Sequence, residues 1–149
     1  MRLVLAVLGA VFAANTAGAG EAELRFGTAF CTFLATGAAR PDPALFSMEL
    51  IALIMPVAAR IAAGESDSDD RIPYMALRDA SPTCRPARVV TANGDAEIEI
   101  SHEFPEDSAS DWSDWLIIKN TVMGMRINDI RLDSFGWGLR EALGDRSLR

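Results

Sequence analysis

The chain has 149 residues, half of them hydrophobic, with 14 basic against 21 acidic side chains, one histidine and two cysteines. That length suits a single domain built around one core. The net charge of -7 disfavours nucleic acid and anionic membranes as partners, because both repel an acidic surface, and it favours a basic partner.

The N-terminal segment has the three parts of a cleavable signal peptide. Arg2 supplies a positive charge, residues 3–14 form an almost unbroken apolar run, and Ala17-Gly18-Ala19 has the small residues that signal peptidase accepts. A membrane helix needs about 20 apolar residues, and this run ends too early for one. We therefore predict a signal peptide over residues 1–19 and one domain over residues 20–149, periplasmic or secreted and without a membrane anchor.

The two cysteines, Cys31 and Cys84, are expected to form a disulfide. An exported protein meets an oxidising compartment, and two cysteines allow a single intramolecular pairing. Closing that loop would stabilise the fold by about 4 kcal/mol on the chain-entropy account. The alternative is a pair of buried free thiols. Because His102 is the only histidine and no Cys-x-x-Cys occurs, neither a metal site nor a cofactor is expected.

Helical periodicity dominates the first half of the chain. Phe26, Phe30, Phe33 and Leu34 recur at the i, i+4, i+7 and i+8 spacing of an amphipathic helix. We expect this helix to stop at Gly37.

A second helix is expected to begin at Ser47, a favourable N-cap, with an apolar face that continues to Gly64. Pro56 lies inside this pattern and should kink the helix or split it in two. The acidic stretch 65–70 lacks the glycine and the distal glutamate of a helix-loop-helix calcium site, so a solvated loop is expected there. Residues 72–86 have no clear period and are predicted to form a turn of helix and then a loop.

The second half changes to the two-residue period of β-strands. Asn93-Gly94 stands between two such runs, which is a strong hairpin signal. In the second run Ile98, Ile100 and His102 share one face. The predicted strands cover residues 87–92, 96–104, 112–119 and 125–132, and a short helix is predicted over residues 138–143.

The fourth predicted strand contains an irregularity. Ile127 and Ile130 fall on opposite faces if the alternation is strict, and a β-bulge near Asn128-Asp129 would bring them to the same face. Helices followed by consecutive hairpin-linked strands indicate the α+β class. We therefore expect the helices to pack on one face of a four-stranded antiparallel sheet.

Five segments of the chain form a recognisable pattern: Trp115-Leu116-Ile117-Ile118-Lys119, Gly124-Met125-Arg126-Ile127-Asn128-Asp129-Ile130-Arg131, Gly138-Leu139-Arg140-Glu141-Ala142-Leu143, Phe46-Ser47-Met48-Glu49-Leu50 and Pro73-Tyr74. These segments resemble a family of exported bacterial proteins that has no assigned function. The usual motif of that family is a tryptophan, a basic residue, an isoleucine, paired acids and another isoleucine, followed by a glycine-rich turn into a short helix. Met125 stands here where the tryptophan is usual, and Asn128 replaces one acid.

That family is placed near the nuclear transport factor 2-like, or cystatin-like, α+β cones. The resemblance implies a curved four-stranded sheet wrapped over helices, with a pocket in its concave face. It implies no particular reaction, because some relatives of this broad fold are isomerases or dehydratases and many only bind or dimerise.

Two residues are candidates for acid/base chemistry. His102, as the sole imidazole, could act as a general base in the pocket, or it could be an inert histidine at the rim of the core. Asp129 could be aimed into a site by the predicted bulge, or it could pair with Arg126 or Arg131.

Three aromatic residues are candidates for binding. Tyr74 could reach a pocket mouth, and Trp112 and Trp137 could contribute to a ligand or partner surface, although packing in the core is the alternative for both tryptophans. Trp137 stands between two glycines and is the better candidate for exposure, whereas Trp115 is expected in the core.

The preferred functional hypothesis is a non-enzymatic exported binding or interaction domain. It would engage a protein, or a small apolar ligand, through the concave face. An inhibitor or immunity-type protein that binds a basic partner is one version of this hypothesis. The alternative is a small enzyme of the isomerase or dehydratase kind that uses His102 and Asp129 as acid and base. A homodimeric structural subunit is a third option.

Overall fold

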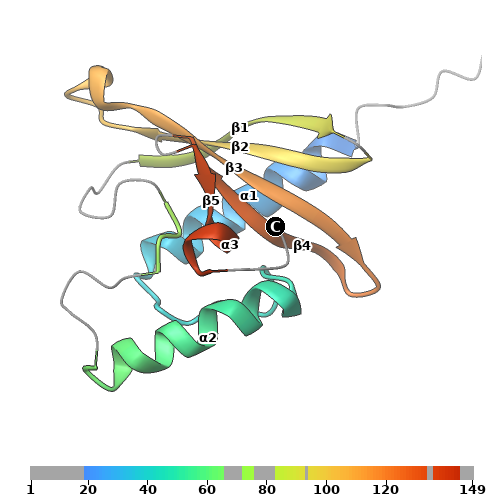
Figure 1. Cartoon of the computed structure of the whole chain (residues 1–149). Coiled ribbons are helices and arrows are strands. Elements are labelled where there is room, and N and C mark those ends of the chain that lie inside the picture. The colour runs from blue at the N-terminus through green and yellow to red at the C-terminus, as the bar shows by residue number, and fades with distance from the viewer. Residues whose placement is uncertain (1–18, 66–71, 76–82, 93, 134–135, 145–149) are drawn as a thin grey trace, which may run out of the picture.

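The computed structural model describes residues 19–65, 72–75, 83–92, 94–133 and 136–144, which form helices packed on one antiparallel sheet (Figure 1). Residues 1–18 of the predicted signal peptide, most of the acidic stretch and Asn93 of the predicted hairpin turn lie outside the described residues.

Two long helices come first in the chain, α1 (Ala19–Ala35) and α2 (Met48–Ala62). Helix α1 ends as predicted, because Gly37 adopts a φ of 64° that favours glycine. Ser47 is confirmed as the N-cap of α2, where its hydroxyl accepts a hydrogen bond from the Leu50 backbone N–H at 3.2 Å. Helix α2 is not split at Pro56, which lies exposed within the continuous helix.

The sheet is an antiparallel meander in which each strand pairs with the next. Its strands are β1 (Thr83–Ala92), β2 (Asp95–Glu103), β3 (Trp112–Thr121), β4 (Gly124–Leu132) and β5 (Trp137–Gly138). A short 3-10 turn, η2 (Ser108–Ser110), precedes β3, and a four-residue helix, α3 (Leu139–Ala142), follows β5 directly. The α+β class is therefore confirmed.

The predicted strand count was wrong, because the sheet has five strands and not four. The additional strand, β5, has two residues, which is too short to show an alternating pattern in the sequence. The first strand also begins at Thr83 and not at residue 87. A register shift between Pro86 and Arg88 interrupts its alternation, and β1 tolerates the proline because it is an edge strand.

Both long helices cover the same face of the sheet, which we call the inner face. The alternation predicted for β2 is confirmed, since Ile98, Ile100 and His102 are all buried. Fully burying one such aliphatic side chain contributes about 1.5–3 kcal/mol. The most deeply buried core side chains from the helices, the connecting segment and the inner face are Phe30, Phe46, Leu50, Ile54, Ile98, Ile100, Leu116, Ile118, Ile127, Ile130, Leu132 and Leu139.

The bulge predicted in the fourth strand is confirmed. Ile117 of β3 pairs with Asp129, whereas the next residue, Ile118, pairs with Ile127, so Asn128 is the extra residue. As a result Ile127 and Ile130 are both fully buried. At Ile127, the edge of β4 that faces away from β3 is hydrogen-bonded to the segment before α2. The Ser47 N–H donates to the Ile127 carbonyl at 2.9 Å.

The predicted disulfide joins α1 to the sheet. Cys31 in α1 is bonded to Cys84 in β1, and the two Cα atoms lie 5.5 Å apart. One helical turn earlier, Gly27 lies so close to β1 that a Cβ atom there would be 2.8 Å from Cβ of Pro86. The helix therefore lies directly on the sheet at this point.

The outer face of the sheet, away from the helices, carries paired charges around one aromatic side chain. Trp115 is buried there, between the guanidinium groups of Arg88 and Arg131 at 5.0 and 5.4 Å from the ring centre. Arg88 pairs with Glu99, and Arg131 pairs with Glu97.

Among the described residues, no helix is both long enough and apolar enough to cross a membrane.

We predict that Gly27→Ala destabilises the protein. Helix propensity alone would favour alanine by up to about 1 kcal/mol, but the added Cβ would overlap Pro86 and should cost about 1–3 kcal/mol. Urea unfolding measures the difference. Ala29→Gly, at an exposed position of the same helix, reports propensity alone. A Gly27→Ala protein more stable than the wild type would show that the close approach does not exist.

Candidate functional site

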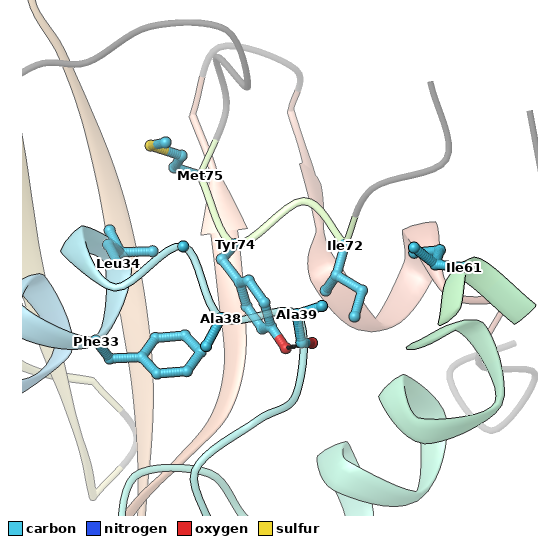
Figure 2. Close-up of a pocket in the computed structure, with 9 residues that line it drawn as sticks. Phe33, Leu34, Ala38, Ala39, Ile61, Ile72, Tyr74 and Met75 are labelled. Atoms are coloured by element: carbon cyan, nitrogen blue, oxygen red, sulfur yellow. Dashed lines mark hydrogen bonds between the residues drawn. The ribbon is translucent and has the colours of Figure 1, made fainter. Parts of the chain in front are cut away.

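A hollow lies at one end of the helical layer, where the chain leaves α1 and returns after α2 (Figure 2). Its volume is about 210 Å³. We call it the apolar pocket and define it by its lining: Phe33, Leu34, Gly37, Ala38, Ala39, Ile61, Ile72, Tyr74 and Met75.

The local sequence explains why space remains there. Helix α1 ends in a tight turn, in which the Thr36 hydroxyl donates to the Phe33 carbonyl at 2.6 Å and the Gly37 N–H donates to the Leu34 carbonyl at 3.1 Å. The chain then continues through Gly37, Ala38 and Ala39, whose small side chains leave one wall unfilled. Ile61, in the last turn of α2, closes the opposite side.

Tyr74 is the predicted binding residue that does line the pocket. Its ring packs edge-on against Phe33, with ring centres 5.1 Å apart, and its hydroxyl donates to the Ala39 carbonyl at 2.9 Å. Burial raises the pKa of this phenol far above its ordinary value of 10.0, so the hydroxyl stays protonated. The lining therefore holds no charged side chain, and its one side-chain hydroxyl already bonds the backbone.

His102 lies elsewhere, on the inner face at the far end of β2. It is fully buried, and its ring stacks on Trp112 with centres 4.6 Å apart. Nε2 of His102 is 3.1 Å from Oδ2 of the equally buried Asp114, at an angle outside hydrogen-bond geometry, and Trp112 Nε1 donates to the same oxygen at 3.1 Å. His102 pairs in the sheet with Cys84 of β1, the strand that carries the disulfide. None of the three side chains His102, Trp112 and Asp114 lines the apolar pocket.

Asp129 is placed by the bulge, but it serves the backbone of the last helix. Its Oδ1 accepts hydrogen bonds from the N–H groups of Ile130 at 2.8 Å and Arg140 at 3.0 Å. Burial raises the pKa of this carboxyl, and the backbone hydrogen bonds from Arg140, Ile130 and Leu139 offset part of the rise. It therefore caps α3, in place of a side chain at the N-cap residue, Gly138.

The two acid/base candidates are not brought together. His102 is opposite Trp112 in the ladder and Asp129 is opposite Ile117, so they lie five positions apart along β3 and on different neighbouring strands. At about 3.3 Å per residue this is roughly 16 Å along the sheet alone.

The tryptophan candidates are half-buried and do not line the apolar pocket. Trp112 covers His102, and Trp137 in β5 pairs with Leu132 and packs against the core. Trp115 is buried as expected, but on the outer face and not in the main core.

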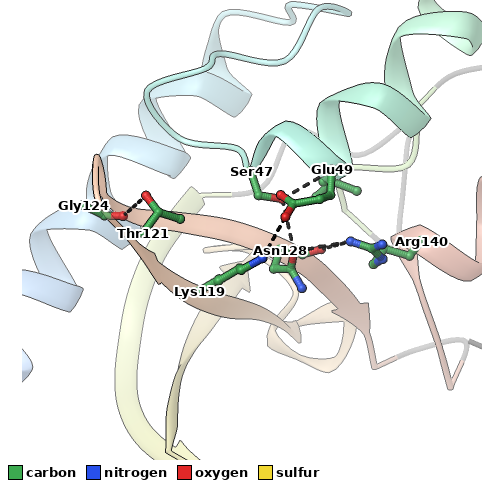
Figure 3. A network of polar contacts seen from close by, with 8 residues as sticks. Ser47, Glu49, Lys119, Thr121, Gly124, Asn128 and Arg140 are labelled. Carbon is green, nitrogen blue, oxygen red and sulfur yellow. Dashed lines mark hydrogen bonds and ion pairs between the residues drawn. The ribbon is translucent and has the colours of Figure 1, made fainter. Parts of the chain in front are cut away.

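A polar network holds α2 and α3 to the bulge (Figure 3). Ser47 donates through its hydroxyl to Oδ1 of Asn128 at 3.2 Å, and Nη1 of Arg140 donates to the same oxygen at 3.3 Å. Beside it, Lys119 of β3 pairs with Glu49 of α2 at 2.8 Å, and this hydrogen bond lowers the pKa of the Glu49 carboxyl. The network holds these elements in place, and none of its residues lines the apolar pocket.

The sequence pointed to Tyr74 but not to the rest of the lining. The one local signal was the run of small residues at 37–39 after a helix stop. Ile61 and Ile72 looked like ordinary core positions, because nothing in their spacing tells that the helices leave a gap between them. Among the described residues, no group of three or more histidine, cysteine or acidic side chains could hold a metal ion.

Comparison of the chain with protein-family models, curated proteins and solved structures finds no match. The site must therefore be interpreted from its own geometry.

Two substitutions at Asp129 separate its capping role from its charge. Asp129→Ala leaves the N–H groups at the start of α3 without an acceptor and should lower the free energy of unfolding by about 1–2 kcal/mol. Asp129→Asn keeps an acceptor without the cost of burying a charge, so it should match or exceed the wild type at pH 7.

The pH dependence has a definite sign. The pKa of Asp129 is higher in the folded state than its ordinary 3.8, so the wild type loses stability relative to Asp129→Asn as the pH rises through that range. Urea unfolding at pH 4 and pH 7 tests this. An asparagine variant as unstable as the alanine variant at both pH values would contradict the assignment.

Proposed function

We propose that this chain is an exported binding domain that takes a small apolar ligand in the apolar pocket. The main support for this proposal is a hollow of about 210 Å³ that is lined by apolar side chains and small residues. A cavity of about 150 Å³ lined by aliphatic groups holds benzene. The pocket therefore fits a single ring or a short alkyl chain, and its charge-free lining disfavours an ionic ligand.

Export is part of this proposal. The pattern of residues 1–19 supports a cleaved signal peptide. The Cys31–Cys84 disulfide supports an oxidising destination, the periplasm or the exterior, because thiols are kept reduced in the cytosol.

The family resemblance supports binding, but at a different place from the one that it implies. A cone-fold relative would use the concave face of its sheet, whereas here Phe30, Leu50 and Ile54 fill the inner face. The ligand site that we propose lies instead at the end of the helical layer, beside Tyr74.

Binding of a protein partner and an enzymatic role are the two alternative hypotheses. An inhibitor or immunity-type role is supported by the net charge of -7, which would attract a basic partner. The isomerase or dehydratase reading has less support, because His102 and Asp129 occupy distant ladder positions and the apolar pocket offers no acid or base.

Filling the pocket should weaken ligand binding. The probes are toluene and n-alkanols from butanol to decanol, titrated into the mature protein by NMR. We expect saturable binding with an optimum at intermediate alkanol length. Ala38→Trp, which puts an indole into the pocket mouth, should weaken binding at least tenfold.

Ala59→Trp is the matched control, because it adds the same ring at an exposed position of α2 outside the pocket lining. It should bind the probes like the wild type, and urea unfolding should show that both variants remain folded. Equal binding by the two variants, or no saturable binding by the wild type, would contradict the proposed function.

A further inference from the structure

The turn between β3 and β4 presents apolar side chains to solvent. Val122 and Met123 form its apex and are 102% and 75% exposed. Of the described residues, only two other large hydrophobic side chains are exposed, Met48 and Met55 on α2. A tight turn normally carries glycine, asparagine or aspartate, so a valine and a methionine at this apex serve no need of the turn itself.

The apex stands clear of the rest of the sheet. In the ladder, the last pair between β2 and β3 is Ala96 with Ile118, whereas the β3–β4 pairing continues to Thr121 and Gly124. Residues 119–126 therefore form a two-stranded extension, which we call the hairpin tip (Figure 1).

The turn is stabilised by hydrogen bonds within it. The Thr121 hydroxyl donates to the Gly124 carbonyl at 2.8 Å and accepts from the Met123 N–H at 3.1 Å, and Gly124 adopts a φ of 94° that suits glycine. The apolar side chains at the apex are thus presented without the entropic cost of ordering a loop.

The charge of the hairpin tip opposes that of the whole chain. No acidic residue occurs from Trp115 to Asn128, although the chain carries 21 acidic side chains. The two cations of the tip, Lys119 and Arg126, face each other directly across the ladder, an arrangement that destabilises a hairpin. Lys119 is paired with Glu49, whereas Arg126 makes no ion pair with any residue that the structure describes.

The spacing of these groups matches a lipid surface. Arg126 is three positions from Met123, about 10 Å of strand, and its guanidinium donates to the Met125 carbonyl at 2.7 Å. Interfacial segments bury their apolar groups about 5–10 Å deep, so a buried apex would put Arg126 at the level of the phosphates.

The acidic remainder of the chain does not prevent this contact. Glu49 of α2 reaches the tip, but it is paired with Lys119 at 2.8 Å. Asp95 begins β2 one residue before the Ala96–Ile118 pair, so it lies near Lys119, about 10 Å of strand from the apex. Along β3 and β4 themselves the nearest acids are Asp114 and Asp129, roughly 20 Å or more from the apex. The Debye length at physiological salt is about 8 Å, so solvent ions screen most of the repulsion from these acids. The net charge of -7 describes the whole chain. The hairpin tip itself carries Lys119 and Arg126 and therefore has a positive local charge.

We propose that the hairpin tip is a contact for anionic lipid bilayers, in which Val122 and Met123 enter the interface and Arg126 pairs with headgroup phosphates. A protein with an apolar, acid-rimmed groove would share some of these features. The lipid surface is favoured because the apex offers two adjacent side chains and a cation at membrane spacing. This inference does not depend on the apolar pocket.

Vesicle flotation tests the proposal with the mature protein. Vesicles of equal parts phosphatidylglycerol and phosphatidylcholine should bind it, and vesicles of phosphatidylcholine alone should bind it more weakly. The double variant Val122→Ser/Met123→Ser should lose at least tenfold in partitioning, and Arg126→Gln about fivefold.

Two controls match these changes elsewhere on the surface. Met55→Ser removes an exposed apolar side chain from α2, and Arg60→Gln removes an exposed cation. Both should bind vesicles like the wild type. Wild-type protein that fails to bind anionic vesicles, or tip variants that bind them unchanged, would overturn the proposal and leave a protein groove as the partner of the tip. Equal binding to both vesicle types would overturn the role of Arg126.

Discussion

Helix α1 meets the sheet through two contacts of different kinds, and the rest of the helical layer depends on where they place it. The disulfide between Cys31 and Cys84 fixes the helix to the edge strand across 53 residues of chain. Gly27 lets the helix backbone lie directly against Pro86 and the side chains of β2. A disulfide closing a loop of this length contributes about 4 kcal/mol, a large share of the stability of a domain this small. With α1 held there, Phe30 and Phe33 form the centre against which Phe46 and Tyr74 pack.

The position of α1 also decides where empty space remains. The inner face is filled under α1 and α2, so a ligand cannot enter between the helices and the sheet. In the part of the chain that the structure describes, a hollow lies past the end of α1, where small residues follow the helix and the Tyr74 hydroxyl bonds the Ala39 carbonyl. The polar network from Ser47 through Asn128 to Arg140 joins the N-terminal end of α2 and the last helix to β4. The two ends of the molecule therefore differ in character: one holds an apolar hollow, and the other carries the projecting hairpin tip.

Much of this fold could be predicted because its signals are local. The alternation of β2 predicted that His102 lies on the buried face, and it is buried. In β4, strict alternation would put Ile127 and Ile130 on opposite faces, so the sequence indicated the bulge that the strand pairing contains. The features that were missed depend on tertiary contacts. Strand β5 has two residues and exists because β4 offers it a partner, and β1 extends back to Thr83 because it pairs with β2 through Glu103. The role of Asp129 was missed for the same reason, since the helix that it caps lies about ten residues further along the chain. The pocket lining comes from three separate segments, and only the packing of the helices brings them together.

Export of the domain and the covalent bond between α1 and the sheet can be tested in one measurement. The full chain is expressed in a host that exports it, alkylated without prior reduction, and its intact mass is determined. We expect the mass of residues 20–149 less two hydrogens, with no alkyl group attached, because the signal peptide has been removed and Cys31 is bonded to Cys84. A protein that retains residues 1–19, or one that carries two alkyl groups, would contradict the account.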